Sequence, residues 1–292
     1  MDILVIAGPT ASGKSNIAID IAKKLNGEII SADSMQVYKF MDIGTAKVIN
    51  TNGIPHHLIN IAYPNEAISV AYYQALANQV IKEIQKKGKL PILVGGSGFY
   101  INAVLYGINF NENSQNIPYR NSLYDAYQKN GIHYLYDMLK KVDEVYATQN
   151  KNNYARLIRG LEFYYQTRTK ISVHNSIQKN NPIAYNAKVF IIDTDRKILY
   201  ENINKRVDIM IEKGLVNEVQ NLLNMGYTKD LSSLNSIGYK EIVNHINGNI
   251  SLNEAIDDIK KNSRHFAKRQ ITWFKNKTNG MWVQNSDIIS YL

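Results

Sequence analysis

The chain of 292 residues is long enough for one large hydrophobic core with a smaller attached unit. It has no cysteine, which excludes disulfides, cysteine-based zinc sites and thiol catalysis, and no apolar run of membrane-span length, so we expect no membrane partner. The net charge of +9 is compatible with a polyanionic partner, and the chain enters a core strand directly after Asp2, which predicts a cytoplasmic protein without a signal peptide.

A phosphate-binding loop is predicted near the start of the chain. The stretch GPTASGKS follows a short apolar run typical of a strand, precedes a helical pattern, and fits G-x-x-x-x-G-K-[ST] at every defined position. Gly8 and Gly13 let backbone amides face phosphate oxygens. Lys14 adds a positive charge, and the Ser15 hydroxyl is placed to bind Mg²⁺. The loop therefore predicts a site for a diphosphate or a longer polyphosphate, without specifying the molecule.

The first 108 residues alternate between strand and helix patterns, which predicts an α/β fold with a parallel sheet and helices on both faces. Strands are expected at residues 3–7, 28–32 and 90–94, and helices at residues 16–25 and 69–87. Ligands of such sheets collect beyond the carboxyl ends of the strands. Three segments fall there: the phosphate loop, the run from Asp33 to Gln36, and the run from Gly95 to Gly98.

Residues 109–181 are predicted to be a helical domain inserted into the sheet domain. Helical patterns cover residues 119–129, 132–141 and 155–167, after an Asn-rich stretch. Residues 111–190 carry 11 Lys/Arg against 6 Asp/Glu and hold ten of the 20 tyrosines. Tyrosines can stack on bases, although half-buried packing is the more common role. Charge alone does not distinguish an RNA surface from a solvated basic face.

Residues 182–292 return to strand and helix patterns and are expected to complete the core. A strand is predicted over residues 186–193, and helices over residues 196–213, 216–224, 239–245 and 252–276. The last of these helices carries seven lysines and arginines and no acid between residues 260 and 277. The strand ends in Asp193, which could hold Mg²⁺ in an NTPase, but we favour a buried strand followed by an Asp cap for the next helix.

Two further residues are candidates for chemistry. Asp33 could act as a general base, as an outer-shell group of Mg²⁺ or as a simple cap. Arg206, on a predicted helix, is either a surface residue or a clamp for an anion. His56 and His57 lack a third spaced ligand, so local hydrogen bonding is favoured over a metal site.

Taken together, six blocks of the sequence resemble the bacterial tRNA dimethylallyltransferases, the IPP transferase family. They are GPTASGKS, SADSMQVYKFMDIGTAK, LVGGSGFYINAVL, RLIRGLEFYYQT, SIGYKE and AKRQITWF, in family order from Gly8 to about Phe274. Many nucleotide enzymes share the phosphate loop, whereas DSMQVY, DIGTAK and AKRQITWF are far more specific. The resemblance implies a P-loop NTPase-like core, formed by residues 1–108 and 182–292, with residues 109–181 as an inserted, tRNA-binding helical domain, in a monomer.

The resemblance also implies a reaction. A dimethylallyl group passes from dimethylallyl diphosphate to the exocyclic amine of the adenosine immediately 3′ of the tRNA anticodon, with Mg²⁺ as cofactor. The phosphate loop then holds the diphosphate of the prenyl donor rather than ATP. Asp33 matches the general base that accepts a proton from the amine, and Arg206 matches an arginine that grips the diphosphate. Thr10 completes the catalytic candidates.

Binding residues follow from the same resemblance. The diphosphate set is Gly8, Pro9, Thr10, Ala11, Ser12, Gly13, Lys14, Ser15 and Arg206, with Ser15 as the metal contact. The tRNA set is Asp33, Ser34, Met35, Gln36, Ser97, Arg156, Arg159, Asn235, Ser236, Ile237, Gly238, Tyr239 and Lys240. The chain departs from the family at residues 151–155, where KNNYA replaces an acidic-proline link.

The residues themselves leave three other functions open. A related isopentenyltransferase would act on free AMP or ADP, but a mononucleotide needs no basic helical insertion. A P-loop small-molecule kinase or ATPase would use Asp193 to hold Mg²⁺. An RNA-binding module without catalysis would leave the phosphate loop unexplained.

Overall fold

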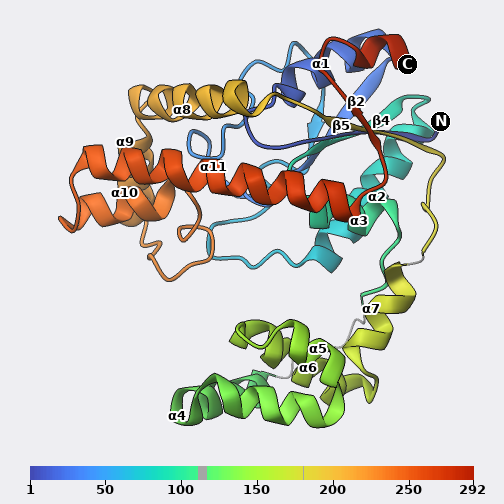
Figure 1. The fold of residues 1–292 in the computed structure, drawn as a ribbon. Helices are drawn as coiled ribbons and strands as arrows, with labels where there is room; N and C mark the ends of the chain where they lie inside the picture. The colour runs from blue at the N-terminus through green and yellow to red at the C-terminus, as the bar shows by residue number, and fades with distance from the viewer. Residues whose placement is uncertain (111–116, 180) are drawn as a thin grey trace. The chain divides into compact units, whose positions relative to one another are not determined.

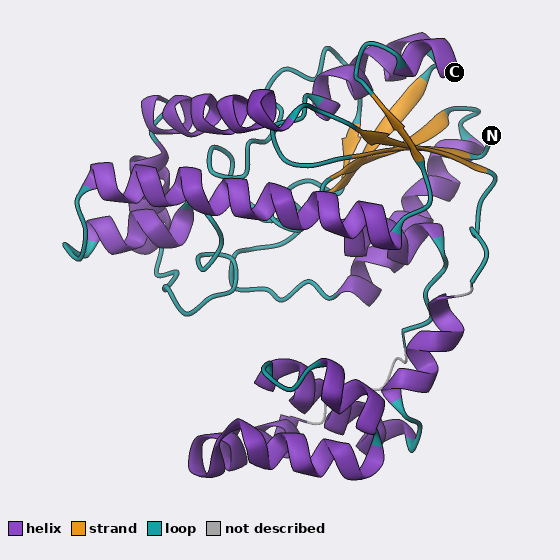
Figure 2. Cartoon of the chain, in the orientation of Figure 1, coloured by secondary structure: helices purple, strands orange, loops and turns teal. Residues whose placement is uncertain are grey.

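The computed structural model describes residues 1–110, 117–179 and 181–292. The chain divides into two compact units, drawn in Figure 1 and Figure 2. The larger unit contains Met1–Leu105 and Ile183–Leu292, and the smaller one contains Tyr106–Pro182. Each unit has its own hydrophobic core.

The larger unit is built on a sheet of six parallel strands, so the predicted α/β fold is confirmed. The strand order is β3-β2-β4-β1-β5-β6. β1, β2, β4 and β5 are mostly buried, as expected for parallel strands that read as continuous apolar runs. β3 and β6 are too short to give such a run and were not predicted. The bounds are Ile3–Ala7 (β1), Gly27–Ala32 (β2), His56–His57 (β3), Leu90–Gly95 (β4), Ala187–Ile192 (β5) and Met281–Val283 (β6).

Helices cover the sheet and extend the larger unit. One core cluster joins α1 to the sheet, and a second fills the space among α8, α9, α10 and α11, which Figure 1 shows as a group of helices beside the sheet. The predicted helices are found with their ends within two residues of the expected positions, whereas α3 was not predicted. The bounds are Lys14–Lys24 (α1), Val70–Lys86 (α2), Gly98–Leu105 (α3), Arg196–Glu212 (α8), Leu215–Asn224 (α9), Tyr239–Ile246 (α10) and Leu252–Lys277 (α11), with a short 3-10 turn at Ile288–Tyr291.

The cap of α8 corrects one prediction. Asp195, not Asp193, caps this helix, because its carboxylate accepts hydrogen bonds from the amides of Lys197 (2.8 Å) and Ile198 (3.2 Å). Asp193 is exposed just after β5, and its own amide donates to the carbonyl of Val283. The buried strand expected before it is present.

The smaller unit is helical, and its helices are α4 (Ile117–Val142), α5 (Glu144–Gln149), α6 (Tyr154–Thr167) and α7 (Ile171–Lys179). Gly131 interrupts α4 with a φ of 77°, which explains why the sequence shows two helical patterns there. α5 and α7 are short and were not predicted. Leu135, Leu139 and Leu157 lie in the core of this unit with no exposed surface. The Asn-rich stretch of residues 111–116 lies outside the described residues.

Glu28 is a buried acid in β2 whose charge is balanced by three neighbours. Its carboxylate lies 2.7 Å from His57 Nε2, 2.8 Å from Lys89 Nζ and 3.3 Å from Lys87 Nζ, and its side chain is 2% exposed. Burial alone would raise the pKa of Glu28, but the hydrogen bonds from Lys89, His57 and Lys87 lower it to about 2. His56 Nδ1 bonds the carbonyl of Ile54, so both histidines make local hydrogen bonds.

We expect Glu28→Gln to lower the free energy of unfolding by about 2–3 kcal/mol, because it removes the buried carboxylate that pairs with His57, Lys87 and Lys89. The folded pKa lies below the unfolded value of about 4.3, so the wild-type contribution is complete above roughly pH 5 and is lost as the pH falls through about 2. Urea unfolding at about pH 7 and about pH 3 should show the difference shrinking at low pH. Glu83→Gln, an exposed change on α2, is the control. A difference that is the same at both pH values would contradict the assignment.

Candidate active site

The carboxyl ends of β1, β2 and β4 meet at one edge of the sheet, and a pocket lies there. It combines the phosphate loop, the segment after β2, the end of β4, and side chains from α8 and α11. The structure therefore brings the three predicted catalytic candidates together. The residues that line the pocket are Thr10, Gly13, Lys14, Ser15, Asn16, Asp33, Gln36, Thr45, Ala46, Val94, Gly95, Arg206, Phe266 and Gln270.

Four members of the predicted diphosphate set shape the loop without lining the pocket. Gly8, Pro9, Ala11 and Ser12 are buried, and Pro9 has no amide hydrogen to offer a phosphate. Gly13 has a φ of 82° as it enters α1, a conformation that favours glycine. The members of the loop that line the pocket are Thr10, Gly13, Lys14 and Ser15.

Gln270 braces the phosphate loop against the end of β4. Its Oε1 accepts a hydrogen bond from the amide of Thr10 (2.8 Å), and its Nε2 donates to the carbonyl of Gly96 (2.9 Å). The side chain is 6% exposed. Sequence reasoning gave Gln270 no role, although it lies inside the AKRQITWF block. A second brace, Asn285 Nδ2 donating to the carbonyl of Ser12 (2.5 Å), had no sequence signal.

Two cations face one acid in the pocket. Lys14 Nζ donates to the carbonyl of Pro9 (3.0 Å), and Arg206 Nη1 donates to Thr10 Oγ1 (3.0 Å). Burial, together with the nearby charge of Arg206, lowers the pKa of Lys14 to about 8. Burial also lowers the pKa of Arg206. Asp33 is the one acid among the residues that line the pocket, so the pocket is electropositive and suited to an anion.

The lowered pKa of Lys14 predicts a pH-dependent affinity for diphosphate. An anion favours the charged form of Lys14, so binding should take up a proton near pH 8. We expect the affinity for inorganic diphosphate to fall as the pH rises above about 8. Titration calorimetry in buffers of different ionisation enthalpy measures the uptake. The same titration on Lys14→Arg, whose charge is constant in this range, gives the contribution of the ligand's own protonation, and equal uptake by both proteins would contradict this role of Lys14.

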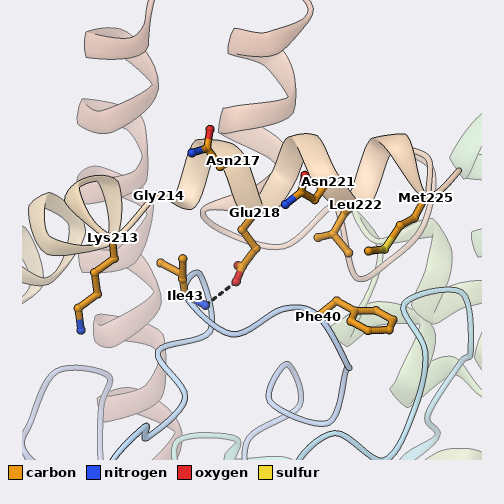
Figure 3. Close-up of a pocket in the computed structure, with 9 residues that line it drawn as sticks. All are labelled: Phe40, Ile43, Lys213, Gly214, Asn217, Glu218, Asn221, Leu222 and Met225. Atoms are coloured by element: carbon orange, nitrogen blue, oxygen red, sulfur yellow. Dashed lines mark hydrogen bonds between the residues drawn. The ribbon is translucent and has the colours of Figure 1, made fainter.

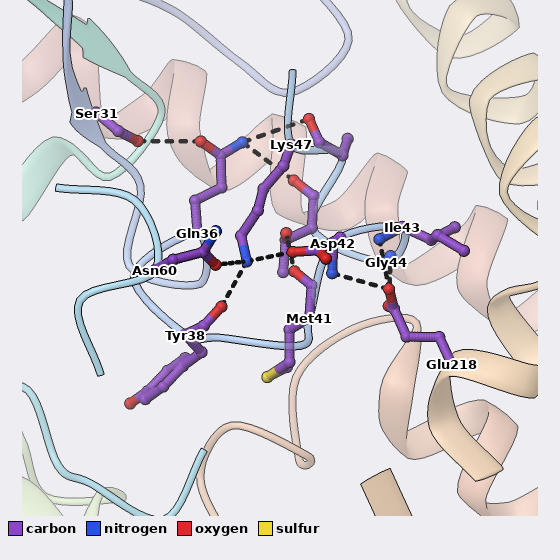
Figure 4. Close-up of polar contacts among 12 residues, drawn as sticks. Ser31, Gln36, Tyr38, Met41, Asp42, Ile43, Gly44, Lys47, Asn60 and Glu218 are labelled. Atoms are coloured by element: carbon purple, nitrogen blue, oxygen red, sulfur yellow. Dashed lines mark hydrogen bonds and ion pairs between the residues drawn. The ribbon is translucent and has the colours of Figure 1, made fainter. Parts of the chain in front are cut away.

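Asp33 begins a segment that is fixed to the end of β4. Its Oδ1 accepts a hydrogen bond from the amide of Met35 (2.9 Å), and Oδ2 has no hydrogen bond within the described residues. The amide of Ser34 donates to Ser97 Oγ (2.9 Å), and the two hydroxyls are 3.3 Å apart. The amide group of Gln36 is used inside the protein, by Ser31 on one side and by the carbonyl of Thr45 on the other (Figure 4).

The predicted tRNA segment of residues 235–240 is only partly accessible. Asn235 is exposed, and Ser236, Ile237 and Lys240 are half-buried. Gly238 is buried. Tyr239 is 0% exposed, and its hydroxyl donates to Glu218 Oε1 (2.6 Å). The expected contact of Tyr239 with RNA is therefore corrected: this side chain is part of the core and leaves no surface for a ligand.

Arg156 and Arg159 lie on α6 of the smaller unit. Both are exposed on one helix. Arg156 Nη1 donates to Asn150 Oδ1 (3.1 Å), and the guanidinium of Arg159 lies 5.8 Å from the centre of the Phe163 ring. They form a basic surface within that unit.

The oxygen donors of the pocket fit a Mg²⁺ ion that takes few ligands from the protein and most of them from a bound diphosphate and water. Ser15 and Asp33 contribute a hydroxyl and a carboxylate, while Asp193 is not among the residues that line the pocket. Within residues 1–110, 117–179 and 181–292, no group of three or more His, Asp or Glu side chains could hold a metal. Mg²⁺ commonly takes one or two protein ligands and completes its shell with phosphate oxygens and water.

A parallel sheet with a phosphate loop, two cations and an adjacent carboxylate defines a P-loop enzyme of the α/β class. The family model described as IPP transferase matches residues 36–277. The chain belongs to the IPP transferase family.

Named relatives and solved structures agree with this assignment. A tRNA dimethylallyltransferase of Thermoanaerobacter sp. (strain X514) is 47% identical over 100% of this chain and 94% of its own, and one of Lachnoclostridium phytofermentans is 46% identical over 98% and 92%. The full-length tRNA isopentenylpyrophosphate transferase of Bacillus halodurans is 42% identical, with a TM-score of 0.73 over 100% of this chain and 94% of that one. A eukaryotic dimethylallyltransferase acting on tRNA is 28% identical, with a TM-score of 0.82 over 99% and 75%.

Proposed function

We propose that this protein transfers a dimethylallyl group from dimethylallyl diphosphate to the exocyclic amine of the adenosine immediately 3′ of the anticodon in tRNA. The observation that carries the proposal is that the Asp33 carboxylate lines the same pocket as Lys14 and Arg206. One pocket then offers a base for the amine of the acceptor and two cations for the diphosphate of the donor. The relatives named as tRNA dimethylallyltransferases support this choice of reactants.

In this proposal, Asp33 accepts the proton that the exocyclic amine of adenine loses. The exocyclic amine of adenine is a poor nucleophile, because its lone pair is delocalised into the ring. As the bond from nitrogen to the prenyl carbon forms, positive charge grows on the amine, and a carboxylate within hydrogen-bond reach relieves it by accepting the proton. The half-buried Asp33 has one oxygen committed to the Met35 amide and one left for this task.

The leaving diphosphate is stabilised by the cations of the pocket. As the carbon–oxygen bond breaks, negative charge grows on the diphosphate, and in this proposal Lys14, Arg206 and the phosphate loop, which line the pocket, stabilise it. Mg²⁺ bound at Ser15 would add charge stabilisation. Ala46, Val94 and Phe266 also line the pocket and offer apolar contacts for a five-carbon chain.

Basic surfaces support RNA as the acceptor. On α11, Lys261, Lys268 and Arg269 are exposed, whereas Lys260 pairs with Asp208 (2.6 Å). The smaller unit adds the surface of Arg156 and Arg159. A base must leave its stack to reach a pocket, which costs a few kcal/mol and is easier from a single-stranded anticodon loop. No helix in the described part of the chain is long and apolar enough to span a bilayer. We place the reaction in the cytoplasm and expect a monomer to carry it out.

Transfer of labelled prenyl groups to defined acceptors tests the proposal. The enzyme is incubated with labelled dimethylallyl diphosphate, Mg²⁺ and an anticodon stem-loop, with the same stem-loop carrying guanosine at the target position as the control. Label should enter the first RNA and not the second. Efficient transfer to free AMP, with none to RNA, would support the mononucleotide enzyme instead.

A further inference from the structure

We infer that Glu218 is a positioning residue for this transfer, which holds the loop of residues 38–47 so that its last part forms one wall of the reaction pocket. The inference rests on the proposed function for its kinetic part. Figure 3 shows Glu218 on α9, reaching the loop at Ile43. Glu218 contacts the loop and not the reactants, and its loss should lower kcat by moving the pocket wall.

Both carboxylate oxygens of Glu218 are used twice. Oε2 accepts hydrogen bonds from the amides of Asp42 (2.8 Å) and Ile43 (2.7 Å). Oε1 accepts from the amide of Gly44 (3.1 Å) and from the Tyr239 hydroxyl (2.6 Å). Three successive amides that converge on one carboxylate form an anion-binding nest, and here the anion is part of the chain (Figure 4). Bonds to an ionised acceptor are stronger than bonds between neutral groups, so this clamp is tight.

The loop adopts a backbone that needs such a clamp. Phe40 and Ala46 have φ values of 66° and 52°, in the left-handed region that residues other than glycine rarely adopt. Gly44 is pressed against the Tyr239 ring, where an added Cβ would lie 2.5 Å from a ring carbon. Strained backbone persists only where its surroundings hold it. Glu218 accepts hydrogen bonds from the stretch of the loop that lies between Phe40 and Ala46 in the chain. These bonds hold the two strained residues in place.

The clamp is connected to the pocket through the end of the loop. Thr45 and Ala46 line the pocket, and their carbonyls accept hydrogen bonds from Gln36 Nε2 at 3.1 Å and 3.5 Å. Gln36 Oε1 accepts from Ser31 Oγ (3.0 Å) in β2, the strand that delivers Asp33. Gln36 thus ties the pocket wall to β2, two residues before the proposed base, and Figure 4 shows these contacts beside those of Glu218.

Lys47 holds the same loop through further hydrogen bonds. Lys47 Nζ donates to Asp42 Oδ1 (2.7 Å) and Asn60 Oδ1 (2.6 Å). None of the contacts of Glu218 reaches Thr10, Lys14 or Arg206, the residues that face the diphosphate. Loss of Glu218 should therefore disturb the alignment of acceptor and donor without emptying the diphosphate site.

The test compares Glu218→Gln with Glu212→Gln, a matched change at an exposed glutamate on α8. Glutamine keeps the shape but places a donor group against backbone amides that also donate. We expect Glu218→Gln to lower kcat at least about tenfold, because small misplacements of reacting groups are costly. Its dissociation constant for inorganic diphosphate should stay within about twofold of the wild type, and hydrogen exchange of residues 38–47 should become faster. Glu212→Gln should change none of these.

Two results would overturn the inference: a kcat of Glu218→Gln within about twofold of the control, or a loss of diphosphate affinity as large as the loss of kcat. Tyr239→Phe, which keeps the ring against Gly44 and removes one donor, should lower kcat in the same direction but less, and it decides the question if Glu218→Gln does not fold. Diphosphate binding and hydrogen exchange need no prenyl transfer. A wild-type protein that binds diphosphate and does not prenylate RNA would therefore contradict the proposed function alone.

Discussion

Asp33→Asn is expected to lower the rate of prenyl transfer about 10³-fold while the affinity for the anticodon stem-loop changes little. General base catalysis contributes roughly 10²- to 10⁴-fold, and the amide keeps the size of the side chain but cannot accept the proton. Asparagine also keeps an oxygen for the amide of Met35, so the local turn should survive. Single-turnover transfer and stem-loop binding, measured on the same preparation, give the two quantities.

Asp193→Asn is the control for that prediction. Asp193 also follows a buried parallel strand of the sheet, but it is exposed and does not line the pocket. Its substitution should leave the transfer rate within about twofold of the wild type, because it removes no group in reach of the reactants. Equal losses of transfer and RNA affinity in Asp33→Asn would show that Asp33 binds RNA rather than acting as the base.

Arg206→Ala is expected to lower kcat/KM for dimethylallyl diphosphate about 10²- to 10³-fold. Removing one preorganised donor to a developing negative charge costs this much in other enzymes. Arg206 comes from α8, and its bond to Thr10 aims the guanidinium at the phosphate loop. Steady-state kinetics with varied prenyl donor at saturating RNA measures the effect.

Lys205→Ala, at the neighbouring exposed position, controls for the loss of one positive charge from α8. Its kcat/KM for the prenyl donor should stay near the wild-type value. Arg206→Lys should recover only part of the loss, since a lysine cannot present a planar pair of donors. A defect of Arg206→Ala that is confined to RNA affinity would contradict the diphosphate role.

Local features of the sequence predicted most of the fold. The strands β1, β2, β4 and β5 are apolar runs, and the long helices follow a clear helical period, so both are readable without tertiary information. β3 has two residues, and its place in the sheet comes from pairing with β2, which no local pattern reports. The cap at Asp195 was misplaced to Asp193 because two aspartates two residues apart offer the same local signal.

The site was predicted less completely than the fold. The phosphate loop and Asp33 belong to short sequence motifs, and residues of both line the pocket. The brace between Gln270 and Thr10 joins residues 260 positions apart, and only the folded chain brings them together. Tyr239 was taken for an RNA contact because its segment matches a family block. Its burial is set by Gly44 and Glu218, which lie far away in the sequence.

Mass analysis of nucleosides tests the central claim most directly. The protein is incubated with dimethylallyl diphosphate, Mg²⁺ and an anticodon stem-loop, and in parallel with ATP in place of the prenyl donor, before the RNA is digested. The account predicts that one adenosine, next to the anticodon, gains a dimethylallyl group, with one diphosphate released for each group transferred and no turnover of ATP. Phosphate release from ATP, with the adenosine unchanged in both reactions, would contradict it.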